Sequence, residues 1–185
     1  MNRTITSREA ILATCKQIVA QSGMPALNMR VVAARCGVAL GSIYNYFPSK
    51  EELLVATVES IWAEIVQTGG IASGSSLTDT VSQLFESVRM GSAKYPMFLN
   101  VHAVTFAHMD KDKGRKAMNR FFGRIEALLR QSLDGDHSVR SDAFGEGFTK
   151  PAFISFVFSN ILALIMDGQT TCDFLLAMIK RAICI

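Results

Sequence analysis

The sequence has 185 residues, of which 49% are apolar and 19% are charged, and its formal net charge is +3 at pH 7. This length allows one or two domains, and the apolar content is high enough to form a large buried core. No uninterrupted apolar run reaches the roughly 18 residues of a membrane-spanning helix, and the N-terminus lacks a signal-peptide core, so we expect a cytoplasmic protein with no membrane partner.

Charge is distributed unevenly along the chain. Residues 1–50 contain six basic side chains and one acidic side chain, a net charge of +5, whereas residues 51–185 carry a net charge of −2. A basic module joined to a slightly acidic remainder is typical of a DNA-binding head on a separate sensing body. We therefore expect two domains, at residues 1–50 and 51–185. A solvated charged face is the alternative explanation of the same bias.

A first amphipathic helix is predicted near the N-terminus. The sequence TSRE begins at Thr6 and has the form of a capping box. Ile11, Cys15 and Ile18 follow at helical spacing. Gly23 is expected to end this helix, which should brace the segment that comes next.

Residues 28–50 read NMRVVAARCGVALGSIYNYFPSK, which predicts a helix-turn-helix. Asn28 is placed to cap a first short helix, and Gly37 can adopt the left-handed conformation that the turn requires. In the second helix Ile43 and Phe47 are spaced i and i+4 and should face inward. Hydroxyl, amide and aromatic groups are then left on the outer face.

Within this segment, GVALGSIYNYFPSKEELL resembles the TetR family of one-component transcriptional regulators. The family pattern has an alanine-rich helix, then GV-x-x-G-[ST]-[IL]-Y-x-[YH]-F, a lysine and a leucine-rich helix. Ala39 departs from it where a capping Ser or Thr is usual, and Leu40 where a polar or basic residue is frequent. The resemblance covers about residues 7–66 and implies an all-α fold of about nine helices. An N-terminal three-helix DNA-binding bundle would precede a helical ligand-binding and dimerisation domain.

The resemblance also implies roles for individual side chains in DNA binding. Tyr44 and Lys50 match positions that contact phosphates, and Arg30 matches one that reaches a base edge or the backbone. Gly41 would let the helix backbone approach DNA closely, and Leu40 would contact a thymine methyl group. The full set of expected DNA contacts is Asn28, Arg30, Ala39, Leu40, Gly41, Ser42, Tyr44, Asn45, Tyr46 and Lys50.

Helical periodicity continues beyond the helix-turn-helix. We expect a long helix at residues 50–67, a Gly/Ser-rich loop at 68–76 and a helix at 78–94. Pro96 should separate the last of these from a sixth helix. The helix at 50–67 is the only continuous connection between the basic head and the apolar body, so it is the expected route of any signal between them.

The remaining elements follow the same periodicity. The charged residues 110–114 are expected to form a turn, and a seventh helix should end near Gly135. Residues 134–151 are interpreted as a loop. Two final apolar helices are predicted, at about 151–167 and 171–184.

Aromatic and methionine side chains of the middle helices have two interpretations. Such stripes usually form a solid core, whereas the family resemblance raises the alternative of a cavity for a small apolar or amphipathic effector. Sequence spacing does not separate these alternatives. The candidate cavity residues are Trp62, Phe85, Phe98, His102, Phe106, Met118 and Phe122.

The last two predicted helices are the most apolar part of the sequence. An isolated chain would expose too much of this surface, so we expect a two-fold homodimer. The expected interface residues are Phe153, Phe156, Val157, Ile161, Leu164, Ile165, Phe174, Leu175, Met178 and Ile179.

No residue pattern supports catalysis, a metal site or a cofactor. His102 and His108 could act as bases and Cys15 or Cys172 as nucleophiles, but they form no recognisable set. No phosphate-binding loop or paired metal ligands occur. The four cysteines have no metal-ligand spacing and are interpreted as small buried hydrophobes.

Together these features favour a homodimeric repressor that binds a palindromic double-stranded operator and is released by a small molecule. The alternative is a DNA-binding regulator that answers to redox state or to a protein partner. A small-molecule enzyme is a distant third reading.

Overall fold

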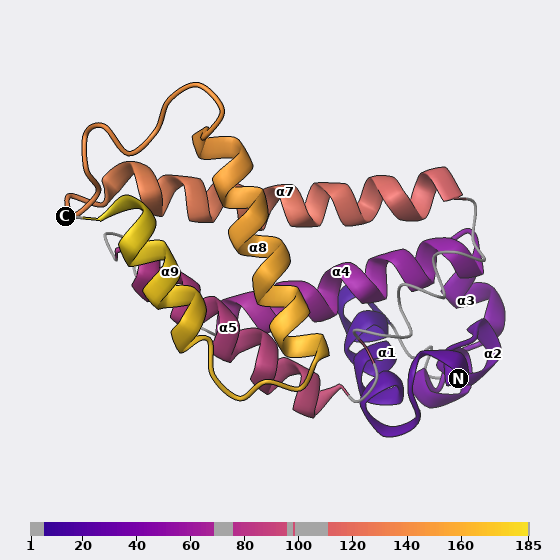
Figure 1. Ribbon diagram of the computed structural model, residues 1–185. Coiled ribbons are helices and arrows are strands. Elements are labelled where there is room, and N and C mark those ends of the chain that lie inside the picture. The colour runs from indigo at the N-terminus through magenta and orange to yellow at the C-terminus, as the bar shows by residue number, and fades with distance from the viewer. Residues whose placement is uncertain (1–5, 69–75, 96–97, 99–110, 185) are drawn as a thin grey trace. The chain divides into compact units, whose positions relative to one another are not determined.

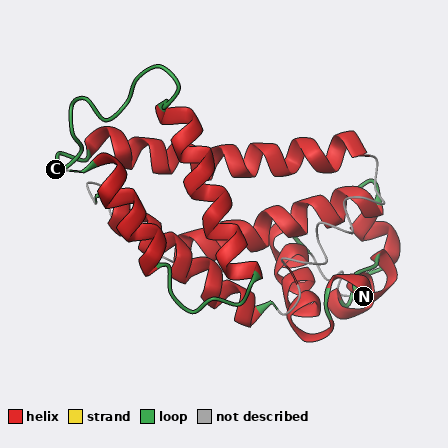
Figure 2. Cartoon of the chain, viewed as in Figure 1, coloured by secondary structure: helices red, strands yellow, loops and turns green. Residues whose placement is uncertain are grey.

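The computed structural model describes residues 6–68, 76–95, 98 and 111–184. Within these ranges all regular structure is helical, with eight α-helices, one short 3-10 helix and two isolated β-bridges (Figure 1, Figure 2). The predicted all-α class is confirmed. The sixth helix expected after Pro96 lies outside the described residues, together with His102 and Phe106.

The chain divides into two compact units. Unit 1 comprises Met1–Glu64 and Ser92–Met118, and unit 2 comprises Ile65–Gly91 and Asn119–Ile185. Buried apolar side chains occur in both, for example Ile43 in unit 1 and Leu84 in unit 2.

Helix α1, Arg8–Ser22, ends at Gly23 as predicted, but Ser7 and not Thr6 caps its start, one residue later than the TSRE capping box implies. The backbone amide of Ala10 donates to the Ser7 hydroxyl oxygen at 3.1 Å, which caps the first turn. Gly23 ends the helix with a φ of 75°, a conformation that favours glycine. A short 3-10 helix, Met24–Ala26, then forms the connection.

Helices α4, Lys50–Thr68, and α5, Leu77–Lys94, match the predicted bounds to within one residue. Helix α5 begins at Leu77, whose backbone amide donates to Asp136 at 2.8 Å and is therefore satisfied from outside the helix. In unit 2 these helices approach closely, because a Cβ atom at Gly91 would lie 2.4 Å from Ile65 Cγ1.

Helix α7, Lys111–Gly135, overturns one prediction. Residues 111–114 belong to its first turn, so the turn expected at 110–114 is wrong over these residues. Lysine and arginine are good helix formers, and one interior glycine costs only about 1 kcal/mol. Extending a formed amphipathic helix needs no new nucleus, so the helix continues through Gly114.

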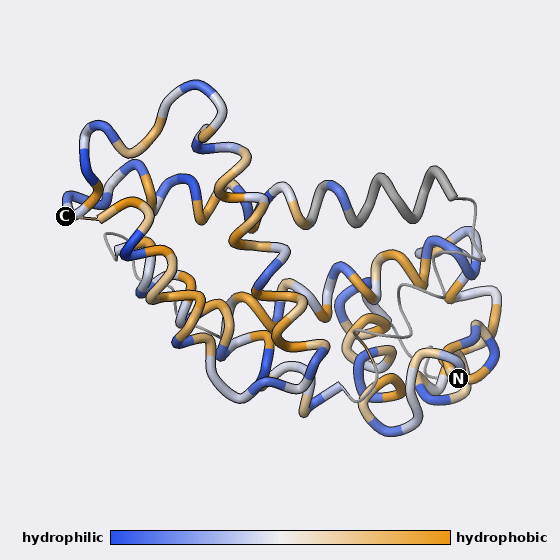
Figure 3. Tube along the Cα trace, in the orientation of Figure 1, coloured by the Kyte–Doolittle hydropathy of each residue, from blue (hydrophilic) through white to orange (hydrophobic). Residues whose placement is uncertain are grey.

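The last two helices, α8, Lys150–Met166, and α9, Asp173–Ile183, run in opposite directions (Figure 1). Helix α8 begins at Thr149, whose hydroxyl oxygen accepts from the Ala152 amide at 3.4 Å. Figure 3 shows hydrophobic residues recurring along both helices. The segment between α7 and α8 is the predicted loop, and it includes a β-bridge between Val139 and Cys184.

Candidate nucleic-acid interface

The helix-turn-helix forms in unit 1 as the local sequence predicts. Helix α2, Met29–Cys36, begins at Asn28, whose side-chain oxygen accepts from the Val31 amide at 3.0 Å. Gly37 follows with a φ of 66° and turns the chain into α3, Leu40–Tyr44. A left-handed residue after a helix satisfies its last carbonyl groups, and the Gly37 amide donates to Ala34 at 3.2 Å.

The short α3 is anchored on one face and exposed on the other. Ile43 and Phe47 are buried in the core of unit 1. Tyr44, Asn45 and Tyr46 are exposed, and Ser42 is half-buried. This segment therefore presents hydroxyl, amide and aromatic groups to solvent on a rigid support.

Gly41 lies in the first turn of α3 and has open space in front of it. A Cβ atom built there would meet no heavy atom within 4 Å. Packing inside the chain therefore gives no reason for a glycine at this position. Ala39 precedes the helix without a side-chain capping bond. The start of α3 therefore carries only the methyl group of Ala39 and the bare backbone of Gly41.

Two exposed cations flank this surface in the sequence and the fold. Arg30 lies in the first turn of α2, and Lys50 is the first residue of α4. Neither makes an ion pair with another described residue. A cation at a helix N-terminus is electrostatically unfavourable, so an anionic partner would stabilise Lys50. Arg35 differs, because its guanidinium donates to the Gln21 amide oxygen at 2.7 Å.

Two of the predicted contact residues are engaged inside the chain. Asn28 caps α2, and the Tyr46 hydroxyl donates to the Thr6 carbonyl at 2.6 Å. Arg8 stacks over the Phe47 ring, 4.5 Å from its centroid. The links from Thr6 and Arg8 to the end of α3 were missed from the sequence. Their only signal is the presence of polar and basic residues at the start of α1.

In unit 1 a single carboxylate contacts residues of α1 and of the end of α5. Glu64 on α4 pairs with Lys16 on α1 and with Lys94 at the end of α5. The buried Tyr95 donates its hydroxyl to Glu64 at 3.0 Å. Burial alone would raise the pKa of the Glu64 carboxyl, but these hydrogen bonds outweigh it and lower the pKa to about 2. Helix α1, which packs against α2, is thereby tied to α4.

The described members of the predicted effector set are packed against other side chains. In unit 1 the Trp62 and Phe98 rings lie edge to face with centroids 5.6 Å apart, and both are buried. In unit 2 the rings of Phe122 and Phe158 pack edge to face with centroids 5.1 Å apart, and Phe85 is buried. Nothing is described of the Met118 side chain.

The predicted interface residues of α8 and α9 fall into two groups. Phe156, Phe174 and Met178 are exposed, and Leu164 is half-buried. The others are buried within the single chain: Phe153, Val157, Ile161, Ile165, Leu175 and Ile179. A partner subunit can therefore reach the first group without any change in the chain.

The cysteines carry little sign of redox chemistry. Burial raises the pKa of Cys15 to about 11 and also raises that of Cys172, so both favour the unreactive thiol. In the described ranges no three His, Cys, Asp or Glu side chains are arranged to hold a metal ion. The described helices also include none with the length and apolarity needed to cross a membrane.

Comparisons with known proteins identify the family. A family model described as "Bacterial regulatory proteins, tetR family" matches residues 11–57. The nucleoid occlusion factor SlmA of Salmonella paratyphi B is 30% identical over 148 residues, which cover 77% of this chain and 71% of that protein. The HTH-type transcriptional repressor KstR of Rhodococcus jostii is 28% identical over 123 residues, 63% of this chain. The chain spans only 58% of that relative's length.

Solved structures agree at the level of the fold. The putative transcriptional regulator SCO7518 of Streptomyces coelicolor A3(2) superimposes with a TM-score of 0.70 at 18% identity, over 95% of this chain and 96% of that one. The transcriptional regulator FadR of Bacillus subtilis, in complex with stearoyl-CoA, gives a TM-score of 0.62 at 17% identity, over 93% of each chain. The chain belongs to the TetR family of bacterial regulatory proteins.

Proposed function

We propose that this TetR-family regulator is a repressor that binds double-stranded DNA through α3 and the start of α2. The observation that carries the proposal is the exposed face of α3, anchored by the buried Ile43 and Phe47. It is flanked by Arg30 and Lys50, which form no ion pair with any described residue. Helix-turn-helix proteins place such a helix in the major groove. The relative KstR is described as a transcriptional repressor, which supports repression rather than activation for this chain.

The geometry supports roles for individual residues in this proposal. Lys50, at the N-terminus of α4, and the exposed Tyr44 hydroxyl would bind phosphates. Arg30 is exposed, and an arginine guanidinium can address guanine O6 and N7 together. The open space at Gly41 allows the backbone of α3 to approach the DNA. Asn28 and Tyr46 would act mainly by positioning, because their polar groups hold α2 and the end of α3 in place.

A homodimer is the second part of the proposal. No charged residue occurs between Lys150 and Asp167, and Phe156, Phe174 and Met178 expose large apolar side chains on α8 and α9. Soluble monomers rarely expose such a surface. An isologous pairing of these faces would cover both surfaces and provide two reading heads for a palindromic operator.

A small apolar or amphipathic molecule is proposed to release the DNA. The FadR structure, which contains stearoyl-CoA, shares the fold and supports this class of effector. Two candidate contacts, His102 and Phe106, lie outside the described residues. Effector and DNA must weaken each other's binding by the same factor, typically about 1–3 kcal/mol.

The test is a mobility-shift titration of the full chain with DNA from its own upstream region, at several salt concentrations. Specific retardation that is reversed by an acyl-CoA or another amphipathic compound is the expected result. Absence of binding to any upstream fragment, with a correctly folded dimer, would reject the DNA-binding proposal. The variant Tyr44→Phe, which keeps the ring and removes the hydroxyl, separates a phosphate contact from packing.

A regulator that answers to a protein partner is the alternative. The relative SlmA supports it, because its printed name describes nucleoid occlusion and no small molecule. Binding that responds to none of the compounds, yet changes with a defined protein partner, would favour this alternative. A redox response has less support, since Cys15 and Cys172 are buried thiols with raised pKa values.

A further inference from the structure

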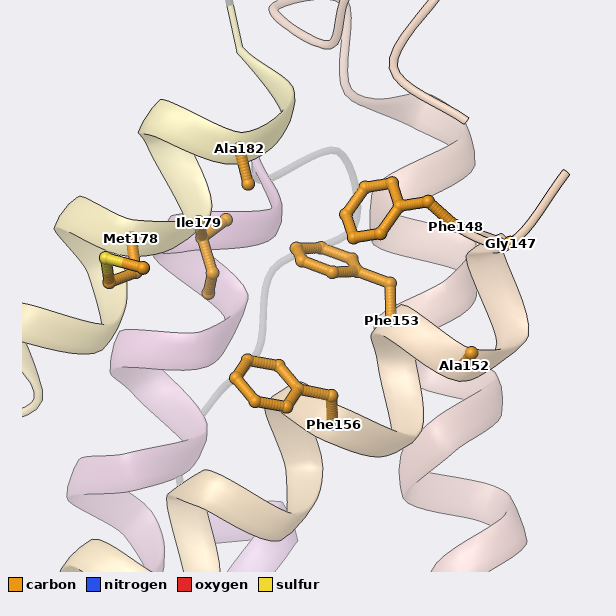
Figure 4. A pocket seen from close by; sticks show the side chains of 8 residues that line it. All are labelled: Gly147, Phe148, Ala152, Phe153, Phe156, Met178, Ile179 and Ala182. Atoms are coloured by element: carbon orange, nitrogen blue, oxygen red, sulfur yellow. The ribbon is translucent and has the colours of Figure 1, made fainter. Parts of the chain in front are cut away.

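A cavity of about 360 Å³ opens where α8 begins and α9 ends (Figure 4). Its walls are apolar and come from both helices and from the turn that precedes α8. Phe148, Phe153 and Phe156 line it from α8 and the preceding turn, and Met178, Ile179 and Ala182 line it from α9, as Figure 4 shows. Ala152 is also part of the lining. Three of the lining side chains are exposed to solvent: Phe148, Phe156 and Met178.

The connection that lines the cavity is fixed by ring packing and hydrogen bonds. The Phe148 ring stacks on Phe144 with centroids 5.5 Å apart, and it contacts Phe153 at 5.4 Å. Earlier in the same connection the Arg140 amide donates to the Ile183 carbonyl at 2.8 Å, and its guanidinium donates to Ala182 at 2.9 Å. The turn is thereby fixed to the end of α9, and the cavity exists before any partner binds.

The same surface carries a protruding ring. Phe174, in the first turn of α9, is 81% exposed, the highest value among the large apolar side chains that are described. It lies four residues before Met178, so both side chains point from one face of α9. Phe174 and the cavity are therefore at opposite ends of one helical face.

Two-fold symmetry converts this arrangement into a reciprocal contact. Consider a two-fold axis that lies in the interface, perpendicular to α8 and α9. It places the start of α9 in one subunit opposite the end of α9 in the other. Each Phe174 then arrives at the other subunit's cavity, and the two contacts form together. The side chains between the ends of α8 favour this approach, because Ser159 and Ala163 are small and exposed.

We propose that the cavity is the socket for Phe174 of a second copy of this chain, so that the turn before α8 determines which partner is accepted. This inference rests on the proposed homodimer and adds its register. A second copy explains the cavity together with the exposed Phe174 on the same face of α9, a face that also carries the exposed Arg181. A small apolar ligand would explain the cavity alone.

The first experiment measures dimer dissociation by analytical ultracentrifugation of the full chain. Phe174→Ala should raise the dissociation constant by about 30- to 100-fold, as expected for an aromatic anchor seated in a pocket. Met90→Ala is the matched control, since Met90 is an exposed apolar residue on α5 and should leave dissociation unchanged. Ala152→Phe fills the socket and should weaken the wild-type dimer, yet weaken the Phe174→Ala dimer much less.

The second experiment tests the contact directly. In a background with Cys36→Ser and Cys184→Ser, one chain carries Phe174→Cys and another carries Ala152→Cys. Under oxidation the mixture should give a covalent dimer, and neither chain alone should do so. Disulfide formation by Phe174→Cys alone would place the two rings at the axis and overturn the proposed register.

The outcomes separate this inference from the proposed dimer. A stable wild-type dimer that is unaffected by Phe174→Ala and gives no mixed disulfide would overturn the socket and leave the dimer intact. A monomeric wild type would overturn both. Binding of the dye 1-anilinonaphthalene-8-sulfonate to the intact dimer, abolished by Ala152→Phe, would show an open cavity and overturn the socket in favour of a small apolar ligand.

Discussion

Two helical glycines, Gly41 and Gly91, differ in what surrounds them in the structure. Gly91 on α5 is packed against Ile65, whereas Gly41 on α3 faces open space. The first is explained by the core of unit 2. The second has no explanation within the chain, which is why a close approach of DNA is the proposed reason.

We predict that Gly41→Ala separates stability from DNA binding. The added methyl group meets nothing in the chain, and alanine is the better helix former, so stability should stay equal or rise by up to about 0.5–1 kcal/mol. Affinity for DNA should fall, because the methyl group stands between α3 and the duplex. Thermal unfolding and mobility shifts on one protein preparation measure both quantities.

Gly91→Ala is the matched control and should behave in the opposite way. Its new Cβ would clash with Ile65, so the free energy of unfolding should decrease by about 1–3 kcal/mol. Affinity per folded molecule should change less than for Gly41→Ala. Unchanged DNA affinity in Gly41→Ala would remove this glycine from the interface.

Lys50→Ala should weaken DNA binding through charge alone. One phosphate contact per subunit would be lost, so the slope of log affinity against log salt should decrease by about 1 per subunit and about 2 per dimer. Arg124→Ala removes an exposed cation from α7 and is the control. Equal slopes for Lys50→Ala and the wild type would contradict the assignment.

At the scale of helices, the Glu64 network is the feature that the sequence conceals. Its partners lie 48, 30 and 31 residues away, and none shares a helix with it. Lys16 brings α1 to α4, and α1 in turn supports the helix-turn-helix. The orientation of the reading head therefore depends in part on one ionised carboxylate.

Because the pKa of Glu64 is lowered, we predict that the folded chain loses stability as the pH falls. The pKa of Glu64 in the folded chain, about 2, is below its ordinary value of 4.5, so its contribution is complete above about pH 5 and is lost as pH falls towards 2. Allowing for solvent screening of a partly exposed pair, the loss between pH 5 and 3 should be about 1–2 kcal/mol. Denaturant titrations at these two pH values measure it.

Glu64→Gln should remove most of this pH-dependent loss, since the amide does not titrate in this range. Glu146→Gln changes an exposed carboxyl in the turn before α8 and serves as the control. If the wild type and Glu64→Gln lost the same stability between pH 5 and 3, the carboxylate would not be held ionised by its partners.

At the scale of the molecule, the exposed face of α8 and α9 decides the oligomeric state. We predict that Phe156→Glu yields monomers, because it places a charge in the centre of an apolar interface. Met90→Glu, an equally exposed position on α5, should remain dimeric. Light scattering measures the mass, and mobility shifts should show that the Phe156→Glu monomer has lost tight binding to a palindrome. A dimeric Phe156→Glu would remove this face from the interface.

The sequence by itself determined the helix-turn-helix almost completely. Asn28 and Gly37 act on backbone groups within a few residues, so their roles can be read from local spacing, and Ile43 and Phe47 follow the helical period. Family membership follows from the same short segment. These features are local, because capping bonds and turn conformations need no distant partner.

Only the tertiary structure decided which residues of the later helices face outward. Periodicity marks α8 as apolar nearly all round, so it could not separate the buried Val157 and Ile161 from the exposed Phe156. Glu64 likewise resembles any surface carboxylate until α1 and α5 bring Lys16 and Lys94 to it. The physical reason is that burial and ion pairing depend on which surfaces meet, and the residues that supply those surfaces are far apart in the chain.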